Sequence, residues 1–349
     1  MSALVTVSLA EIEALAARAL RASNVGEASA LAVARSIAAA ERDGQEIVGL
    51  SYLPTYCDHA ACGKVDGRAQ PELRALSPSV IAVDARNGFA HPALALGLPS
   101  LAEAARRQGV AVLAVGDSYA CGSLGYFVET LAEQGLIALM VANASPSIAP
   151  HGGKTAFFGT NPLAFATPRA DGPPLVIDQS SSVVAKVAVI DAHRRGASLP
   201  PGWALDADGQ PTSDPNAAMA GSLCAIGGYK GAGLALLVDV LAGGLTGSNF
   251  SFEASSFGDC EGGPPRTGQV VIALDPTLFA GPGFVARAEA LFGAMLAQPG
   301  VRLPGDRRLM AREERQSGVD VPADLLALIQ RYAAHGSPEA LTVSEARPS

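Results

Sequence analysis

Five cysteines are the residues of this chain most typical of metal binding or redox chemistry. They form no Cys-x-x-Cys pair and no Cys/His cluster with the spacing of a zinc site. An odd number of cysteines without such a framework predicts reduced thiols, and we expect no metal site. The five are Cys57, Cys62, Cys121, Cys224 and Cys260.

A glycine pattern for dinucleotide binding is also missing. Nowhere does Gly-x-Gly-x-x-Gly follow a predicted strand, and the segment from Gly125 to Gln134 has no glycine triplet that would bring the backbone close to a pyrophosphate. If the chain binds a nicotinamide cofactor, it does so without the Rossmann fingerprint.

Length and composition limit the partners. A chain of 349 residues that is 49% hydrophobic can bury a large core and is expected to divide into two packed domains. The net charge of −8 argues against nucleic acid and anionic membranes as partners. No signal peptide is visible after Met1, and the most apolar run, 231–245, is broken by Asp239. We therefore expect a cytoplasmic protein.

The two chain ends are predicted to be helical. Ser8-Leu9-Ala10-Glu11 is a capping box, which predicts a helix to about Ala22, and a second helix follows over 28–42. The segment 58–78 predicts a loop with a short helix at most. Helices over 284–297 and 322–335 complete the end regions, and the last ten or so residues predict a frayed tail.

The middle of the chain alternates between strands and helices, which predicts an α/β core. The expected strands are 80–84, 110–115, 136–143, 174–178 and 269–275, and the expected helices are 92–108, 122–134 and 230–245. We predict an α/β cofactor domain over 79–283 and a mainly helical subdomain formed by 1–78 and 284–340.

Seven uncommon segments stand in fixed order in the chain, and together they resemble the malate/L-lactate dehydrogenase family, which includes sulfolactate dehydrogenases and Δ1-piperideine-2-carboxylate reductases. The resemblance covers about residues 8–335 and implies a non-Rossmann, homodimeric fold that binds NADPH or NADH. The segments are 143–153, 158–165, 178–183, 200–206, 227–231, 245–247 and 303–308.

The resemblance also implies which residues bind the cofactor and substrate. A glycine-containing turn before a helix favours phosphate, because free NH groups point out of a helix N-terminus, and a basic loop at 305–308 suits phosphate oxygens. Substrate contacts are implied at Val48, Tyr52 and Thr160. Each of these segments also has a simpler interpretation. Residues 159–162 could be only a tight turn, Lys230 the start of a surface helix, and Arg307 and Arg308 part of a solvated loop. The implied cofactor residues are Ala120, Cys121, Gly122, Ser123, Leu124, Asp178, Gln179, Ser180, Tyr229, Lys230, Gly305, Arg307 and Arg308.

The family's catalytic residues do not carry over. Its segment Gly-x-x-Ser-His-Gly-x-x-Arg-Leu-Pro aligns with 44–54, where Ile47, Val48 and Tyr52 replace the serine, the histidine and the arginine. Two further polar positions of the family fall on Ala120 and Ala188. Valine cannot donate a proton, and tyrosine cannot grip a carboxylate as arginine does.

Three hypotheses remain open. The first is a reductase of an imine, such as a cyclic imino acid, or of an atypical carbonyl, because an iminium needs no acid from the enzyme. The second is oxidoreduction of a 2-oxo or 2-hydroxy acid with a relocated proton donor. The third is a family member that lost redox activity and serves as a non-redox enzyme or a binding protein. Candidate donors for the second are Tyr52, His151, Tyr119 and Glu46.

Overall fold

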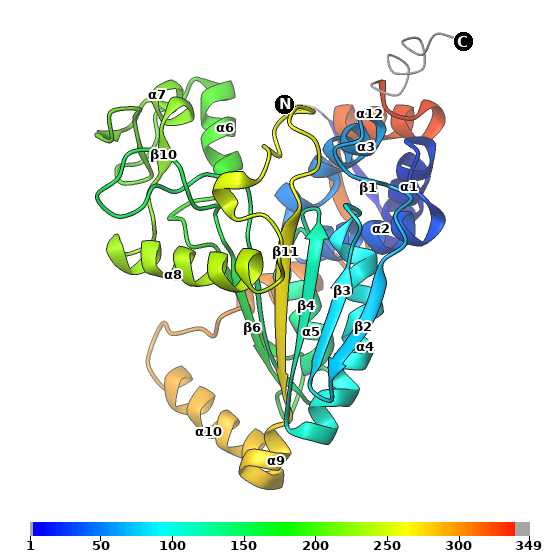
Figure 1. Cartoon of the computed structure of the whole chain (residues 1–349), viewed down its shortest axis with the longest axis vertical. Coiled ribbons are helices and arrows are strands. Elements are labelled where there is room, and N and C mark those ends of the chain that lie inside the picture. Colours follow the sequence, from blue (N-terminus) through cyan, green and yellow to red (C-terminus); the bar gives the residue numbers. More distant parts are fainter. Residues whose placement is uncertain (1–2, 339–349) are drawn as a thin grey trace.

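A seven-stranded sheet forms the centre of the molecule in the computed structural model, which describes residues 3–338 (Figure 1). Residues 339–340 of the predicted helical subdomain, and the predicted frayed tail, lie outside the described residues. The strand order is β2-β3-β4-β11-β5-β6-β7. The strands are β2 (Glu72–Ser77), β3 (Val80–Asp84), β4 (Val110–Ser118), β5 (Ile137–Ala142), β6 (Leu163–Thr167), β7 (Leu175–Gln179) and β11 (Thr267–Leu274).

Most neighbouring strands in this sheet are antiparallel. Only β3 and β4 pair in parallel, and α4 (Ala90–Gln108) connects them. β11, from late in the chain, lies between β4 and β5 and pairs with both in antiparallel fashion. The prediction of a non-Rossmann α/β fold is thus confirmed, since a Rossmann sheet is mostly parallel.

Strand β2 corrects the prediction of a loop over 58–78. It forms an antiparallel hairpin with β3 at the sheet edge, and most of its residues are exposed. An exposed edge strand has no buried face, so its sequence lacks the apolar alternation that reveals a strand.

The sheet is covered on both faces. One face packs α4 and α5 (Leu124–Ala132) around buried Leu94, Leu113 and Phe127. The other face packs α8 (Tyr229–Asp239) and the π-helical turn η3 (Val240–Gly244) around Val238, with Ala242. These layers fix the ends of β6 and β7, where the candidate site lies.

The two ends of the chain form one helical unit with its own core (Figure 1). The predicted capping box at Ser8 and Glu11 is present. The unit contains β1 (Leu4–Val7), α1 (Leu9–Ala22), α2 (Glu27–Arg42), η1 (Glu46–Val48), η2 (Leu50–Tyr52), α3 (Leu53–Ala61), β12 (Val319–Pro322) and α12 (Ala323–His335).

Helix α10 (Phe284–Leu296) does not join this unit. Its buried Phe292 packs with Leu175 and Leu303 against the β6–β7 edge of the sheet. The predicted boundary at 284 assigns α10 to the helical subdomain, whereas in the structure α10 packs on the sheet. Short helices lie nearby: α9 (Pro276–Ala280), η5 (Gly281–Gly283) and α11 (Asp306–Glu314).

A third, smaller core lies beside α8 and contains Ile148, Val189 and Leu223. The segment 196–215 contributes Leu199 and Ala204 to this core. The elements of this unit are α6 (Lys186–Arg195), β8 (Ala204–Leu205), β9 (Pro211–Thr212), α7 (Pro215–Ala220) and β10 (Ser222–Leu223), and η4 (Ser251–Glu253) follows later.

Two cysteines correct the prediction that all five are reduced. Cys62, at the end of α3, and Cys260, in the loop before β11, form a disulfide. They are 198 residues apart in the chain, so no sequence spacing could reveal the pair. Cys57, Cys121 and Cys224 are free thiols.

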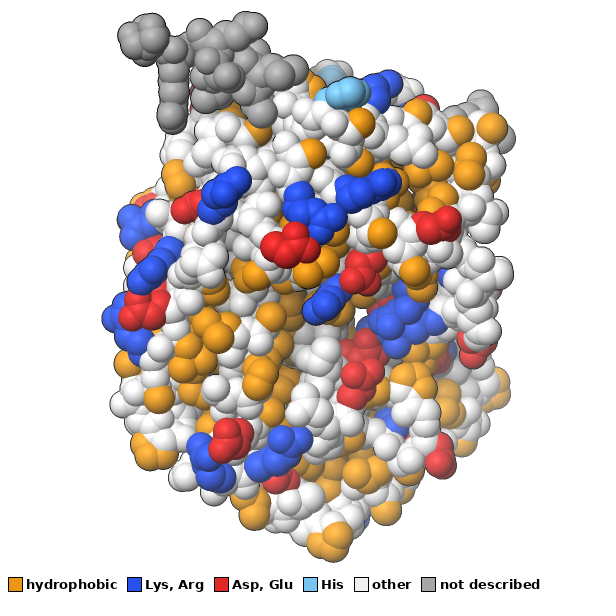
Figure 2. All heavy atoms as spheres, turned by 90° about the vertical axis from the view of Figure 1, so that its right-hand side faces the viewer, with side chains coloured by type: hydrophobic (Ala, Val, Ile, Leu, Met, Phe, Trp, Pro, Cys, Tyr) orange, Lys and Arg blue, Asp and Glu red, His pale blue; other side chains and the backbone are white. Residues whose placement is uncertain are grey.

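The surface carries mixed charges on the face shown in Figure 2, where acidic and basic side chains alternate without a broad patch of one sign. The exposed ion pairs Arg86–Glu72 and Arg107–Glu103 are examples of neighbouring surface charges of opposite sign. Among the described residues, no helix is both long enough and apolar enough to cross a membrane.

Candidate active site

A cleft of about 520 Å³ lies where the helical unit meets the ends of β6 and β7. Four stretches of the chain line it, within 44–48, 122–123, 160–162 and 178–185. Among them are seven of the predicted site residues, which the structure thus brings together. The lining residues are Gly44, Gln45, Glu46, Ile47, Val48, Gly122, Ser123, Thr160, Pro162, Asp178, Gln179, Ser180 and Ala185.

Buried ion pairs beside residue 43 stabilise the cleft wall that residues 44–48 form. Asp43 ends α2 and accepts hydrogen bonds from Arg312 and Arg308 at 2.6 and 3.1 Å. Both arginines also bind Glu129 on α5, with shortest distances of 2.6 and 2.8 Å. This four-residue group, called here the Asp43–Glu129 network, ties α2, α5 and α11 together.

The network favours the ionised form of Asp43. Burial by itself would raise the pKa of Asp43, but the hydrogen bonds from Arg312 and Arg42 outweigh it, so the pKa is lowered. The carboxylate therefore stays ionised, and it anchors the start of the cleft wall.

A second anchor holds the far end of the same wall. Glu41 accepts a hydrogen bond of 2.7 Å from the backbone NH of Leu50, and burial raises the pKa of Glu41. A side chain on Gly49 would collide with the Glu41 carboxylate, so a larger residue there would displace this anchor. Arg315 binds the Glu41 carbonyl at 2.5 Å and the Glu46 carboxylate at 2.6 Å.

The opposite wall depends on Asn161. Its backbone is left-handed (φ +38°), a conformation that asparagine tolerates better than most residues. Its side chain donates to the Ala235 carbonyl at 2.8 Å, and its carbonyl accepts from the Ser181 hydroxyl at 2.7 Å. The neighbouring Thr160 lies in the cleft lining, and the substrate contact that the resemblance implies for it stays a prediction.

Asp178 closes the N-terminus of α5. Its carboxylate accepts from the Ser123 hydroxyl at 2.9 Å and from the backbone NH of Gly125 at 2.7 Å. Burial raises the pKa of Asp178, and the hydrogen bond from Gly125 opposes that rise. The protein's own carboxylate thus occupies this helix start, and the phosphate contact that the resemblance implies there stays a prediction.

The predicted basic loop at 305–308 is also corrected, because Asp306 to Arg308 form the first turn of α11. Arg308 is buried and donates to Asp43 and Glu129, so it belongs to the network and not to a surface phosphate contact. Arg307 is exposed, and Gly305 lies against β7 at Val176.

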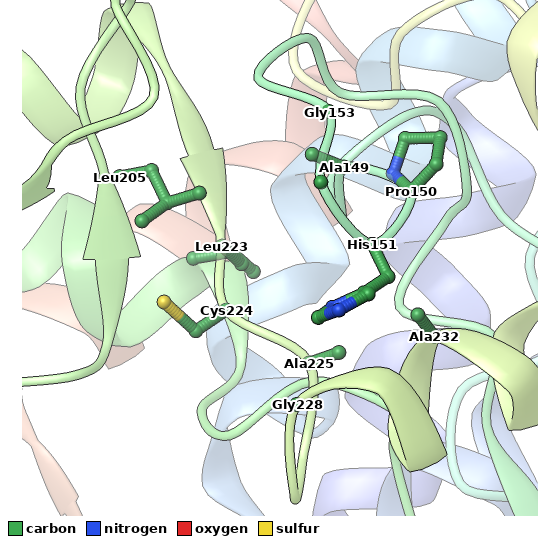
Figure 3. A pocket seen from close by; sticks show the side chains of 11 residues that line it. Ala149, Pro150, His151, Gly153, Leu205, Leu223, Cys224, Ala225, Gly228 and Ala232 are labelled. Atoms are coloured by element: carbon green, nitrogen blue, oxygen red, sulfur yellow. The ribbon is translucent and has the colours of Figure 1, made fainter.

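His151 lies in a second, smaller pocket of about 150 Å³, outside the lining of the cleft. Figure 3 shows its ring over Ala225, across from the segment that carries Leu223 and Cys224. Its ring centroid is 6.0 Å from that of Tyr229, which is exposed. The structure therefore does not support His151 as a proton donor at the cleft.

Tyr52 and Tyr119 lie behind the cleft in an aromatic cluster, and neither lines it. The rings of Tyr52 and Tyr56 are 4.8 Å apart and nearly perpendicular. The Tyr119 hydroxyl is hydrogen-bonded to Nδ1 of His59. The predicted cofactor residues Ala120, Cys121 and Leu124 likewise pack into the cores and not into the cleft.

The lining of the cleft is poor in groups for acid catalysis. Ile47 and Val48 face it, and its two ionisable residues are Glu46 and Asp178. Glu46 is paired with Arg315, and Asp178 caps α5. Within the described chain, the lining thus contains neither a histidine nor a cationic side chain.

A nicotinamide dinucleotide fits the features that surround this cleft. Gly227 and Gly228 precede α8 with positive φ. Nothing lies within 4 Å of where a side chain on Gly228 would be, and a side chain on Gly227 would meet Lys230 Cβ at 4.0 Å. No side chain caps the N-terminus of α8, where Lys230 is exposed. Free NH groups beside a lysine suit a phosphate. Backbone bonds between 181–183 and 224–226 connect this helix start to the cleft wall.

Comparison with known proteins decides the family. A model of the malate/L-lactate dehydrogenase family matches residues 7–330. The chain belongs to this family. The resemblance seen in its seven segments is thereby confirmed, and family members are NAD(P)-dependent oxidoreductases.

The relatives of this chain within the family are named for different reactions. A (2R)-3-sulfolactate dehydrogenase (NADP(+)) from Chromohalobacter salexigens is 47% identical over 94% of this chain and 98% of its own. A Δ1-pyrroline-2-carboxylate reductase from Ancylobacter novellus is 41% identical over 95% and 99%. The crystal structure of Δ1-piperideine-2-carboxylate reductase from Pseudomonas syringae pv. tomato superposes with a TM-score of 0.90 at 39% identity, covering 94% and 99%.

Several residues that shape the cleft were missed by the sequence analysis. Gly44, Gln45, Pro162 and Ala185 line it without any sign of chemistry in the sequence. The Asp43–Glu129 network was missed as well. Its one sequence signal is Arg308 and Arg312 at a spacing of four, which places both on one face of α11.

Proposed function

We propose that this protein is an NAD(P)H-dependent reductase of cyclic imino acids. The observation that carries the proposal is Val48, which lines the cleft at the position where the resemblance expects a catalytic histidine. A ketone develops negative charge on oxygen as it is reduced and needs an acid. A protonated imine becomes a neutral amine and does not.

The charge of the cleft supports this choice. Its ionisable lining residues, Glu46 and Asp178, are both acidic. At position 52, where the resemblance expects an arginine, the chain has Tyr52, which is not part of the lining. A small 2-oxo acid carries only negative charge and would lack a partner here. A cyclic iminium carries a positive charge beside its carboxylate, so an acidic cleft opposes it less.

Bound NAD(P)H supplies the hydride. The protein's own residues position the partners, because a reaction between two held groups avoids most of the entropy cost of an encounter. Thr160 and Gln179 lie in the lining and can donate hydrogen bonds to the substrate. Lys230 and the NH groups at the start of α8 would hold a phosphate of the cofactor.

The 47% identical sulfolactate dehydrogenase favours a second candidate, oxidoreduction of a 2-hydroxy or 2-oxo acid. That reaction requires a proton donor in place of Val48, and it requires binding of an anionic substrate in a cleft whose lining is acidic. A protonated cyclic imine needs no proton donor and carries no net charge, so the imine reaction remains the primary proposal.

Titration of the protein with NADPH and with NADH, followed by fluorescence, tests cofactor binding. Oxidation of the bound cofactor is then measured by absorbance with Δ1-piperideine-2-carboxylate and with pyruvate. The proposal expects turnover of the imine with little of the 2-oxo acid. Faster turnover of pyruvate would support the second candidate, and binding without turnover of either substrate would refute both.

We also propose that the protein is a homodimer in the cytoplasm. Leu236, Leu237 and Val240 are half exposed on α8 and η3, and exposed apolar side chains grouped on one helix are typical of protein interfaces. Sedimentation equilibrium tests the proposal, and a single species of 35.3 kDa at micromolar concentration would contradict it.

A further inference from the structure

Glu46 is the more accessible of the two carboxyl groups in the cleft lining. Its side chain is 63% exposed. Arg315 donates to its Oε1 at 2.6 Å, and Oε2 accepts no hydrogen bond from any described residue. Asp178, by contrast, accepts from Ser123 and Gly125, and burial raises the pKa of Asp178. Glu46 is therefore the lining residue that offers a negative charge to a ligand.

The position of Glu46 is fixed from two sides. Its backbone carbonyl accepts from the NH of Gly49 at 3.1 Å and from the Ser51 hydroxyl. Arg315, which holds the side chain, is itself hydrogen-bonded to the Glu41 carbonyl. A group that is already held in place loses little conformational freedom when a ligand binds it. Glu46 is thus prepared to receive a ligand without rearrangement of the wall.

A cyclic imino acid carries two opposite charges on neighbouring parts of one small ring. Its protonated nitrogen has a positive charge and an N–H, and the adjacent carbon bears a carboxylate. An ionised carboxylate of the protein only accepts hydrogen bonds, so it matches the N–H and repels the substrate carboxylate. Thr160 and Gln179 line other parts of the cleft, where they can donate to the substrate carboxylate.

We propose that Glu46 binds the ring nitrogen of the substrate and thereby selects a cationic cyclic imine over a 2-oxo acid. This inference rests on the proposed function. A 2-oxo acid has oxygen atoms and no N–H to offer, so the Glu46 carboxylate repels it. Glu46 is thus a specificity-determining residue of the cleft.

This role of Glu46 agrees with the loss of the expected histidine. Val48 lies in the same wall, two residues along the chain, and cannot donate a proton. A nearby negative charge favours the protonated form of a base. The substrate therefore keeps its own proton beside Glu46, and hydride addition to it needs no donor from the wall.

The test compares Glu46→Gln with wild type on two ring acids of similar size. Piperidine-2-carboxylate has a positively charged ring nitrogen, and cyclohexanecarboxylate has a carbon in its place. Calorimetry measures both dissociation constants in protein loaded with NADP+ or NAD+. Glu46→Gln should weaken binding of piperidine-2-carboxylate by about tenfold, because a hydrogen bond to a charged group is lost, and should not weaken binding of cyclohexanecarboxylate.

Glutamine is a conservative change here, because it keeps the shape of the side chain and can still accept from Arg315. Glu314→Gln is the matched control. It removes the same charge from an exposed residue at the end of α11, outside the cleft lining, and should leave both dissociation constants unchanged. Equal weakening of both ligands in Glu46→Gln would indicate a structural role and overturn the proposal. Unchanged binding of piperidine-2-carboxylate would overturn it as well.

The proposal is separable from the proposed function. Turnover of Δ1-piperideine-2-carboxylate by wild type decides the proposed function, and the ligand pair decides the role of Glu46. If wild type reduces the imine and Glu46→Gln binds piperidine-2-carboxylate normally, only the role of Glu46 is refuted. If wild type reduces only pyruvate, the proposed function fails. A tenfold loss confined to piperidine-2-carboxylate would then still support Glu46 as the contact for a cationic ring nitrogen.

Discussion

Helices α5 and α8 both begin at glycine-containing turns that the sequence assigns to the cofactor, yet their N-termini differ. The start of α5 is closed, because the Asp178 carboxylate accepts from Ser123 and Gly125 there. The start of α8 has no side-chain cap, and Lys230 beside it is exposed. A helix N-terminus can hold a phosphate only if no side chain of the protein has filled it first.

The contrast continues along the two helices. α5 packs in the main core, and Glu129 binds Arg308 and Arg312. α8 leaves Leu236 and Leu237 half exposed. We infer that α5 is a structural support for the cleft and that α8 is a recognition element. The predictions below test each half of this comparison.

The largest effect is expected from Glu129→Ala on α5. Removing this carboxylate leaves Arg308 buried without one of its partners, which should lower the free energy of unfolding by about 3–5 kcal/mol. Urea denaturation measures the change. Glu103→Ala is the control, because the Glu103–Arg107 pair is exposed and should contribute little. Equal effects of the two changes would contradict a structural role for α5.

A smaller, pH-dependent effect is expected at the start of α5. Burial raises the pKa of Asp178 in the folded state, so the folded protein binds a proton at this carboxyl more tightly than the unfolded chain does. The stability that this protonation adds to the fold is lost as pH rises from the ordinary carboxyl range through the folded pKa. Asparagine cannot ionise and still accepts hydrogen bonds. The stability of Asp178→Asn relative to wild type should therefore rise between pH 3.5 and 7, as measured by urea denaturation. A constant difference across this range would argue against an ionising cap.

The smallest of these effects concerns α8. Lys230→Ala should weaken NAD(P)H binding by roughly tenfold, because one charge-assisted hydrogen bond to a phosphate is lost. Fluorescence titration measures the dissociation constant. Lys154→Ala removes an exposed lysine paired with Asp208 and should leave affinity unchanged. If Lys230→Ala binds the cofactor as wild type does, the open helix start is not a cofactor site.

The sequence predicted the fold better than the contacts within the site. Capping at Ser8, the terminal helices and the α/β middle follow from local patterns, and the structure confirms them. The resemblance assigned Thr160 and Gln179, through the family segments, and Val48, through the segment 44–54, to the binding site, and the structure has all three in one cleft. Local patterns and segment order are properties of the chain itself, so a sequence can reveal them.

Other features depend on partners that only the folded chain brings together. Asp178 was assigned to the cofactor, but its main contacts lie 53 and 55 residues away at the start of α5. Arg308 was assigned to a phosphate, but it pairs with Asp43, 265 residues away. An arginine near the start of a helix looks the same in sequence whether it binds a ligand or a buried carboxylate.

The central claim is that loss of the histidine and the arginine changed the substrate while the cofactor scaffold was kept. The most direct test is the ratio of kcat/KM for Δ1-piperideine-2-carboxylate to that for pyruvate, in wild type and in Val48→His/Tyr52→Arg. We predict that wild type favours the imine and that the double variant shifts the ratio toward pyruvate by about 10²-fold, the lower end of what general acid catalysis contributes. A wild-type preference for pyruvate, with no shift in the variant, would contradict the account.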